Sequence, residues 1–214
     1  MTMIKKENLI KRIIILLFGV FLVATGVAFS IHANLGTSPV TSLPYTLSCC
    51  FGWTSGKWSV VVHSVFIIFQ ILLLRKNYKP INLLQLPLGI FFGTFVDIMN
   101  NALNFLKIET YPQQLFYCFI GIVLVAWGVA FEVEADIMVL AIEGFAVTAS
   151  EVFKKKFGDV KMFTDCGIVV AAVIFGLIFL KKVVGVREGT AAAAILVGQM
   201  SKIFKKLFFG HKKA

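Results

Sequence analysis

An internal repeat within long apolar segments constrains this fold more than any other feature of the sequence. GVFLVATGVAFS at Gly19–Ser30 recurs as GIVLVAWGVAFE at Gly121–Glu132, with eight identities in twelve positions. The correspondence continues in order: Phe51-Gly52 with Phe157-Gly158, the run ending Leu74-Arg75-Lys76 with the run ending Leu180-Lys181-Lys182, and Gly93 with Gly198. Such collinear similarity indicates one structural unit written twice. We therefore predict two related halves, residues 1–110 and residues 111–214.

The composition places the chain in a lipid bilayer. Hydrophobic residues make up 58% of the chain and charged residues 15%, whereas soluble domains are roughly 45–50% apolar and about 25% charged. The first apolar run, Ile13–Ile31, follows basic residues as a signal peptide would, but it is too long for the apolar core of one and lacks a small-residue cleavage motif. We expect it to remain as the first helix of an all-α polytopic membrane protein.

The net charge of +10 would suggest nucleic acid as a partner of a soluble protein. Here most basic residues flank the apolar segments, in clusters at 5–12, 75–79, 154–156 and 202–213. Basic flanks of membrane segments mark cytoplasmic ends and contact anionic lipid headgroups. We therefore predict no nucleic-acid partner, and a multi-pass protein with both termini in the cytoplasm.

Each half has the same order of apolar segments: one long, one short and two further long. The long segments are 13–33, 58–75, 82–105, 114–133, 163–181 and 190–208, and the short ones are 37–50 and 137–153. Because a crossing helix needs ~20 residues, we expect six crossing helices and two short broken or re-entrant helices. Three crossings per half would invert one half relative to the other. Eight crossings with parallel halves fit the distribution of basic residues about as well.

The first short segment follows a break in the apolar pattern. Gly36, Thr37, Ser38 and Pro39 interrupt the sequence there, and a helix beginning at Thr37 or Ser38 would have a good N-cap with proline in its first turn. Irregular backbone at membrane depth must be covered by protein or line a wet cavity. The break therefore predicts an internal cavity faced by free backbone N–H groups. A capped helix at the surface is the alternative.

The second break is acidic. It carries Glu132, Glu134, Asp136 and Glu143, where the first half has Ser30, His32, Asn34 and Thr41. Carboxylates inside membrane segments usually face the protein interior and mark ion or solute pathways. Glu143 lies within the apolar segment, so we predict that it and Glu132 face a solute. Glu134 and Asp136 fit a solvated loop equally well.

Other charged residues complete the candidate site. Lys161 and Asp165 are four residues apart and suit an ion pair on one helical face, whereas Asp97 has no neighbouring cation in the sequence. Arg187 is a candidate partner for a carboxylate on another helix, and Thr190 is a candidate helix cap. The predicted solute-binding residues are Asn34, Thr37, Ser38, Asp97, Glu132, Glu143, Lys161, Asp165, Arg187, Glu188 and Thr190.

The sequence lacks the motifs of known catalytic and cofactor sites. It contains no Gly-x-Ser-x-Gly, HExxH or P-loop pattern, and Cys49, Cys50, Cys118 and Cys166 lack metal-ligand spacing. We therefore predict no enzymatic activity, no metal and no cofactor. His63 lies in the middle of an apolar segment, where it is either packed and neutral or able to titrate. The Gly89–Gly93 pattern GIFFG suits either a close helix contact or a homodimer interface.

Five stretches carry a family resemblance: NLGTSPVTSLPYTLS (34–48), LLQLPLGIFFGTFVDI (83–98), EVEADIMVLAIEG (132–144), VKMFTD (160–165) and GVREGTAAAAILVGQ (185–199). Together they resemble the YczE/YyaS/YitT group of bacterial membrane proteins, near its YczE-like branch. The resemblance implies a multi-spanning protein of the cytoplasmic membrane that moves small molecules. Met138-Val139-Leu140 replaces the glycine-rich turn of relatives, so the two breaks need not bind alike.

We predict a secondary transporter for a small polar or zwitterionic solute, with proton coupling as an option. Rocking of one half against the other would alternate access to the site. A non-transporting binding subunit, or an accessory partner of another membrane protein, is the main alternative. An intramembrane enzyme fits less well, because no nucleophile accompanies the carboxylates.

Overall fold

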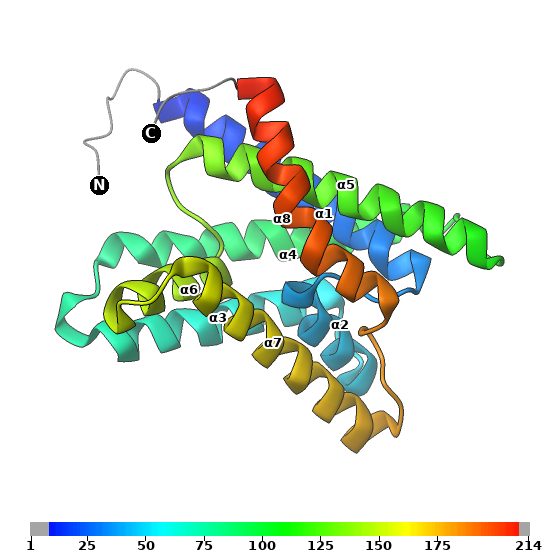
Figure 1. Cartoon of the computed structure of the whole chain (residues 1–214). Helices are drawn as coiled ribbons and strands as arrows, with labels where there is room; N and C mark the ends of the chain where they lie inside the picture. Colours follow the sequence, from blue (N-terminus) through cyan, green and yellow to red (C-terminus); the bar gives the residue numbers. More distant parts are fainter. Residues whose placement is uncertain (1–8, 210–214) are drawn as a thin grey trace.

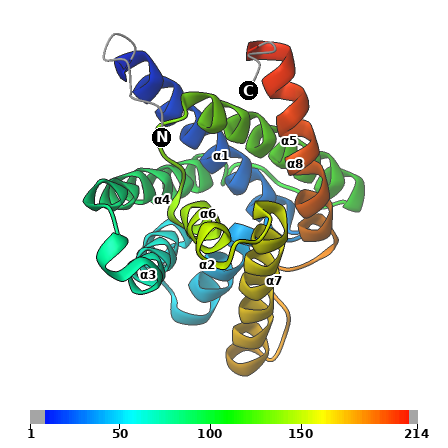
Figure 2. The ribbon, with the colours of Figure 1, turned by 60° about the vertical axis from the view of Figure 1, so that its left-hand side comes forward.

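The computed structural model describes residues 9–209, and within them the chain is helical without strands (Figures 1 and 2). Its α-helices are α1 (Leu9–Ala33), α2 (Pro39–Phe51), α3 (Ser55–Leu74), α4 (Gln85–Ala102), α5 (Tyr111–Ala135), α6 (Ala141–Phe153), α7 (Phe157–Phe175) and α8 (Glu188–Phe209). Short 3-10 turns η2 (Arg75–Asn77) and η3 (Pro80–Leu84) join α3 to α4, and a π-helical turn, η4 (Gly176–Leu180), extends α7. The predicted all-α polytopic fold is confirmed.

Five helical stretches in the described part of the chain are long and apolar enough to cross a membrane. They are Leu9–Ala33, Ser55–Asn77, Pro80–Ala102, Tyr111–Ala135 and Phe157–Leu180. The sequence predicted six, and the sixth, α8, has 22 residues but is less apolar because lysines occupy its second half. Helices α2 and α6 have 13 residues each, which is about 20 Å at 1.5 Å per residue. Neither can cross a hydrocarbon core of ~30 Å.

Four glycines allow α1 and α5 to cross at very close range. A Cβ added at Gly19 would lie 2.8 Å from the carbonyl oxygen of Gly128, and one added at Gly26 would lie 2.6 Å from that of Gly121. Small residues permit this backbone approach between membrane helices. The pairing runs antiparallel, and the repeat relates one contact to the other. Because α1 and α5 are equivalent in the repeat, the two halves are inverted.

The other helices repeat this exchange between halves. Helix α2 packs on α3 and α7, and its counterpart α6 packs on α7 and α3, so each short helix reaches across to the other half. Helix α4 packs on α1 as α8 packs on α5. The pattern fails at one place, because α3 and α4 pack tightly whereas α7 diverges from α8 (Figures 1 and 2). The exact division between halves at residue 110 stays a prediction.

The α3–α4 contact uses the GIFFG pattern and places Asp97 outside the candidate site. A Cβ at Gly93 would lie 2.4 Å from the carbonyl oxygen of Gly56, so both helices need glycine there. The Asp97 carboxylate accepts hydrogen bonds from the Thr54 hydroxyl at 2.6 Å and the Gly56 amide at 2.8 Å. Asp97 therefore joins the end of α4 to the start of α3. The expectation that it faces a solute gains no support from this position.

Candidate functional site

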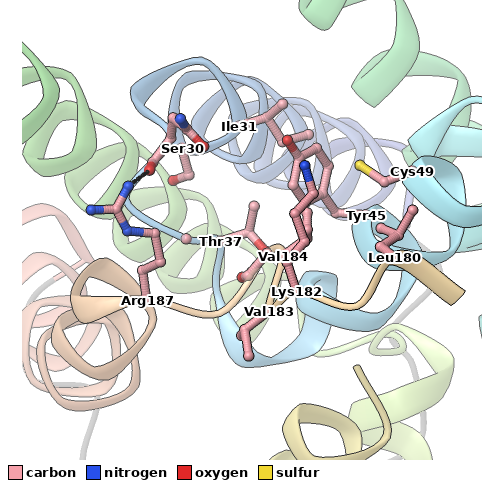
Figure 3. A pocket seen from close by; sticks show the side chains of 13 residues that line it. Ser30, Ile31, Thr37, Tyr45, Cys49, Leu180, Lys182, Val183, Val184 and Arg187 are labelled. Atoms are coloured by element: carbon pink, nitrogen blue, oxygen red, sulfur yellow. Dashed lines mark hydrogen bonds between the residues drawn. The ribbon is translucent and has the colours of Figure 1, made fainter. Parts of the chain in front are cut away.

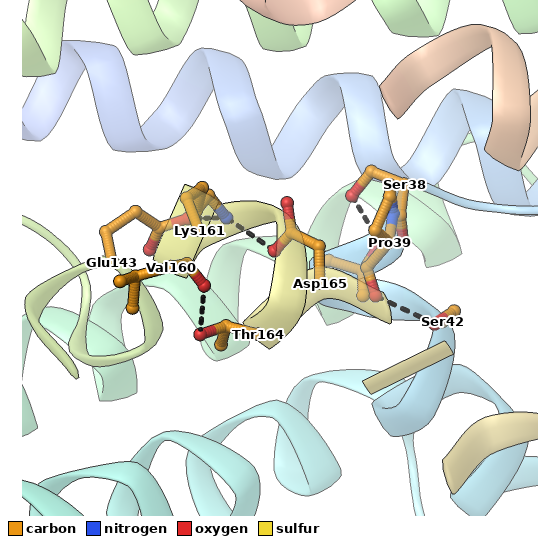
Figure 4. A network of polar contacts seen from close by, with 9 residues as sticks. Ser38, Pro39, Ser42, Glu143, Val160, Lys161, Thr164 and Asp165 are labelled. Atoms are coloured by element: carbon orange, nitrogen blue, oxygen red, sulfur yellow. Dashed lines mark hydrogen bonds and ion pairs between the residues drawn. The ribbon is translucent and has the colours of Figure 1, made fainter. Parts of the chain in front are cut away.

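Three charged side chains meet at the first turn of α6. Glu143 lies in that turn, where the helix dipole favours a carboxylate. The Lys161 ammonium on α7 lies 3.4 Å from Glu143 Oε1 and 2.6 Å from Asp165 Oδ1 (Figure 4). The three side chains are only about a quarter exposed, at 27%, 23% and 24% for Glu143, Lys161 and Asp165. The structure thus contains the expected Lys161–Asp165 pair and adds Glu143 to it.

Two buried groups extend this cluster toward α3 and α5. His63 is 2% exposed and Glu132 is 5% exposed. Glu143 interacts electrostatically with both of them. We call the five residues His63, Glu132, Glu143, Lys161 and Asp165 the central charge cluster. It joins α3 of the first half to α5, α6 and α7 of the second.

The central charge cluster contains polar atoms that the protein leaves without a partner. Among the described residues, His63 Nδ1, Glu132 Oε1 and Glu143 Oε2 are buried and make no hydrogen bond within the protein. Unpaired buried polar groups are costly and uncommon. Inside a membrane protein such groups mark water or solute positions. The cluster therefore leaves two carboxylate oxygens and one imidazole nitrogen without a hydrogen-bond partner among the described residues.

Two glutamines fix the first turn of α6 beside the central charge cluster. Gln70 Nε2 donates to Gln85 Oε1 and to the carbonyl oxygen of Ala141, both at 2.9 Å. Gly144 leaves room for the Gln85 amide group, because a Cβ on it would lie 2.4 Å from Gln85 Nε2. The sequence reasoning missed both glutamines. An amide in the middle of an apolar segment, as at Gln70, was the available signal.

The first break lines a cavity of about 390 Å³ between the end of α1, α2 and the segment 180–187 (Figure 3). The Thr37 amide donates to the carbonyl oxygen of Gly185 at 3.0 Å, and the Gly189 amide donates to that of Leu35 at 2.8 Å. These bonds join the segment 34–38, between α1 and α2, to the segment 181–187 and to the first turn of α8 that follows it. We call the segments 34–38 and 181–187 the connectors of the first and second half. Asn34, Thr37 and Arg187, all predicted site residues, line this cavity.

Several expectations about the first break need correction. Helix α2 begins at Pro39, and the Ser38 hydroxyl contacts that of Thr41 at 3.0 Å without capping a backbone N–H. Ser38 lies directly before α2, the helix that packs on α7 (Figure 4). The Thr37 amide is not free, since it donates to Gly185. The two connectors lie so close that their backbones satisfy each other.

The residues that open α8 also differ from expectation. Arg187 Nη1 donates to the carbonyl oxygen of Asn34 at 2.7 Å, and its Nη2 lies 3.1 Å from the adjacent Glu188. Within residues 9–209 it therefore pairs with no carboxylate on another helix. The Thr190 hydroxyl lies inside the first turn of α8, accepting from the Arg187 amide at 3.3 Å and donating to Gly185 at 3.3 Å. Thr190 thus ties α8 to its own connector.

An arginine side chain binds the C-terminal end of each of the two equivalent helices α1 and α5. Asn34 and Asp136, which are equivalent in the repeat, both have left-handed backbone, with φ of 55° and 47°. Arg187 binds the carbonyl oxygen of Asn34. Arg12 Nε donates to the carbonyl oxygen of Ala135 at 2.7 Å, and Arg12 Nη2 pairs with Asp136 Oδ2 at 3.2 Å. Asp136 is therefore a structural partner of Arg12, which the sequence reasoning missed.

The structure divides nine of the eleven predicted residues into two groups and leaves Ser38 and Asp97 outside both. Glu132, Glu143, Lys161 and Asp165 belong to the central charge cluster, whereas Asn34, Thr37, Arg187, Glu188 and Thr190 gather where the two connectors meet. Over residues 9–209, no three His, Cys, Asp or Glu side chains come together as metal ligands would.

Comparison with known proteins identifies a family of membrane proteins. The sequence model of the family described as "Family of unknown function (DUF6198)" matches residues 10–206. The uncharacterized membrane protein YczE of Bacillus subtilis (strain 168) is 31% identical over 133 residues, covering 62% of this chain and 60% of YczE. The uncharacterized protein YyaS of the same organism is 26% identical over 194 residues, covering 90% of this chain and 92% of YyaS. No solved structure matches. The family resemblance predicted from the sequence is confirmed.

Proposed function

We propose that this chain, which belongs to the DUF6198 family, transports a small polar or zwitterionic solute across the cytoplasmic membrane. The observation that carries this proposal is the central charge cluster with its three unpartnered buried atoms, at the junction of two inverted halves. Inverted-repeat transporters hold their solutes at such junctions. Buried charges without a structural need are typical of solute or proton pathways.

The charges of the cluster favour a solute with a cationic group. Lys161 and Asp165 form the shorter contact and largely neutralise each other. This leaves Glu132 Oε1 and Glu143 Oε2 to accept hydrogen bonds from an ammonium group or to bind a coupling proton. The equivalent first-half residues, Ser30 and Thr41, are neutral. The solute site therefore belongs chiefly to the second half.

The packing of the short helices provides a route for alternating access. Helices α2 and α6 act as re-entrant elements, each packed across the boundary between the halves. Rocking of one half moves α6 relative to α3, and with it the distance between Glu143 and His63. Both termini lie in the cytoplasm in this proposal, consistent with the basic residues at each end.

Neutralising Glu143 tests the proposal. Wild type, Glu143→Gln and Glu151→Gln are reconstituted into liposomes, and uptake of glycine, lysine, glycine betaine, glutamate and choline is measured by mass spectrometry. Glu151 is the matched control, because it is exposed near the end of the same helix. We expect uptake of a cationic or zwitterionic probe by the wild type and the control, and at least a roughly tenfold loss in Glu143→Gln, because a hydrogen bond to a charged group is worth about 1.5–3 kcal/mol.

Two results would count against this function. Uptake that survives Glu143→Gln unchanged would remove the central charge cluster from the solute path. Probe binding to the purified protein, seen as a higher melting temperature, without flux into liposomes would favour the alternative of a binding subunit.

A further inference from the structure

The cavity beside the first break has the size and walls of a ligand site. Its volume of about 390 Å³ falls within the roughly 300–1,000 Å³ of small-molecule pockets. Apolar side chains form much of its wall: Ile31, Leu180, Val183 and Val184, with the ring of Tyr45 (Figure 3). An apolar wall interrupted by a few polar groups is typical of sites that bind amphipathic small molecules.

The charge of this cavity is opposite to that of the central charge cluster. Lys182 and Arg187 line it, and no aspartate or glutamate is among its lining residues. Glu188 offsets part of the Arg187 charge. Within residues 9–209, the Lys182 ammonium makes neither an ion pair nor a side-chain hydrogen bond, and its side chain extends toward Tyr45 (Figure 3). Apolar walls around a cation strengthen its field.

Specific hydrogen bonds fix the wall of the cavity that the segment 182–185 forms. The Thr46 hydroxyl donates to the carbonyl oxygen of Val184 at 2.8 Å, and the Thr37 amide donates to that of Gly185 at 3.0 Å. Gly185 has φ of 77°, and a Cβ on it would lie 2.9 Å from the Thr46 hydroxyl oxygen. The segment that carries Lys182 is therefore fixed against α2.

We propose that this cavity binds an organic anion, with its carboxylate or phosphate on Lys182 and its apolar part against Ile31 and Val183. Arg187 at the rim adds a second cation. The site is separate from the central charge cluster and does not depend on the transport proposal. Two kinds of ligand combine an anionic group with an apolar part: a water-soluble organic acid and an anionic phospholipid, which would bind through its headgroup.

A native cysteine reports on the cavity. Cys49 is exposed and lines it, whereas Cys166 is exposed on α7 and does not. The full-length protein is treated with N-ethylmaleimide in neutral detergent, and modification rates at both cysteines are read by peptide mass spectrometry. Octanoate is the probe, and octanol is the uncharged control of equal chain length. We expect octanoate to slow modification of Cys49 and not of Cys166, and octanol to have no effect.

Two substitutions locate the anion. Lys182→Gln should weaken the protection of Cys49 by octanoate roughly fivefold, as expected for one partly exposed ion pair. Lys181→Gln is the matched control, since it removes the neighbouring charge, which does not line the cavity, and should leave protection unchanged. Equal protection in wild type and Lys182→Gln would overturn the proposal.

A lipid arm distinguishes the two sources. The same labelling is measured in nanodiscs of phosphatidylcholine alone and with phosphatidylglycerol. Protection by phosphatidylglycerol that requires Lys182, without protection by octanoate, assigns the site to a lipid headgroup. Protection by octanoate alone assigns it to a soluble acid. Protection of Cys49 by neither overturns the proposal.

Discussion

The two halves share their order of helices but differ in how their last two helices meet. In the first half, α3 and α4 form a tight antiparallel pair joined by η2 and η3. In the second half, α7 and α8 splay apart (Figure 1). The extended segment between them lines the cavity beside the first break. One duplicated unit therefore exists in a closed form and an open form within one chain.

The residues at equivalent positions account for this difference. Gly56 and Gly93 bring α3 and α4 together, and the repeat places Met162 and Gly198 at their counterparts. Met162 is 57% exposed, and a Cβ on Gly198 would meet nothing within 4 Å. Asp97, which binds the start of α3, corresponds to a lysine, Lys202. The second half therefore has no counterpart of the Gly56 glycine or of the Asp97 carboxylate, which hold α3 and α4 together in the first half.

Alanine at the two equivalent glycines should give the largest contrast between the halves. We expect Gly93→Ala to lower the free energy of unfolding by about 3 kcal/mol, because its Cβ would overlap Gly56. Gly198→Ala should be neutral or stabilising by about 0.5–1 kcal/mol, because its site is open and alanine favours helix. Unfolding by SDS titration measures both. Equal effects would show that α3 and α4 are no closer than α7 and α8.

Removal of the Asp97 charge should have an intermediate effect. Asp97→Asn weakens the bonds to the Thr54 hydroxyl and the Gly56 amide, so we expect a loss of about 1–2 kcal/mol. Lys202→Gln at the equivalent position should change stability by less than about 0.5 kcal/mol, since Lys202 is exposed. Hydrogen exchange of the amides at 54–57 should quicken in Asp97→Asn only. Unchanged exchange there would mean that Asp97 does not hold the start of α3.

The smallest expected difference is between equivalent threonine substitutions in the two short helices, α2 and α6. Thr46 holds the segment 181–187 through Val184, whereas its counterpart Thr148 makes no hydrogen bond through its side chain within the described residues. Thr46→Val should cost about 1 kcal/mol and increase proteolysis after Lys182, while Thr148→Val should change neither. Equal proteolysis of the two variants would contradict the role given to Thr46.

Local pattern predicted the helices with little error. The short segment expected at 37–50 is α2 at Pro39–Phe51, and the long one expected at 114–133 is α5 at Tyr111–Ala135. Segment length and proline position determine such boundaries. Helix α8 shows the limit of this reasoning, because its length suffices for a crossing while its lysines lower its apolarity. Its crossing of the membrane stays a prediction.

The candidate site was predictable only in part. The Lys161–Asp165 pair follows from a spacing of four residues on a helix. Three other features depend on contacts between segments far apart in sequence. Glu143 contacts Lys161, Gln70 donates a hydrogen bond to the first turn of α6, and Arg12 forms an ion pair with Asp136. No periodicity within a segment encodes such contacts.

The order and length of the helices, their duplication and their place in a bilayer were determined by the sequence itself, because these follow from local apolarity and spacing. Only the tertiary structure decided which charges meet, how the two connectors satisfy each other and which half is closed. The physical reason is that these properties depend on close approach between distant surfaces, and a single atom at Gly56 or Gly93 is enough to prevent it.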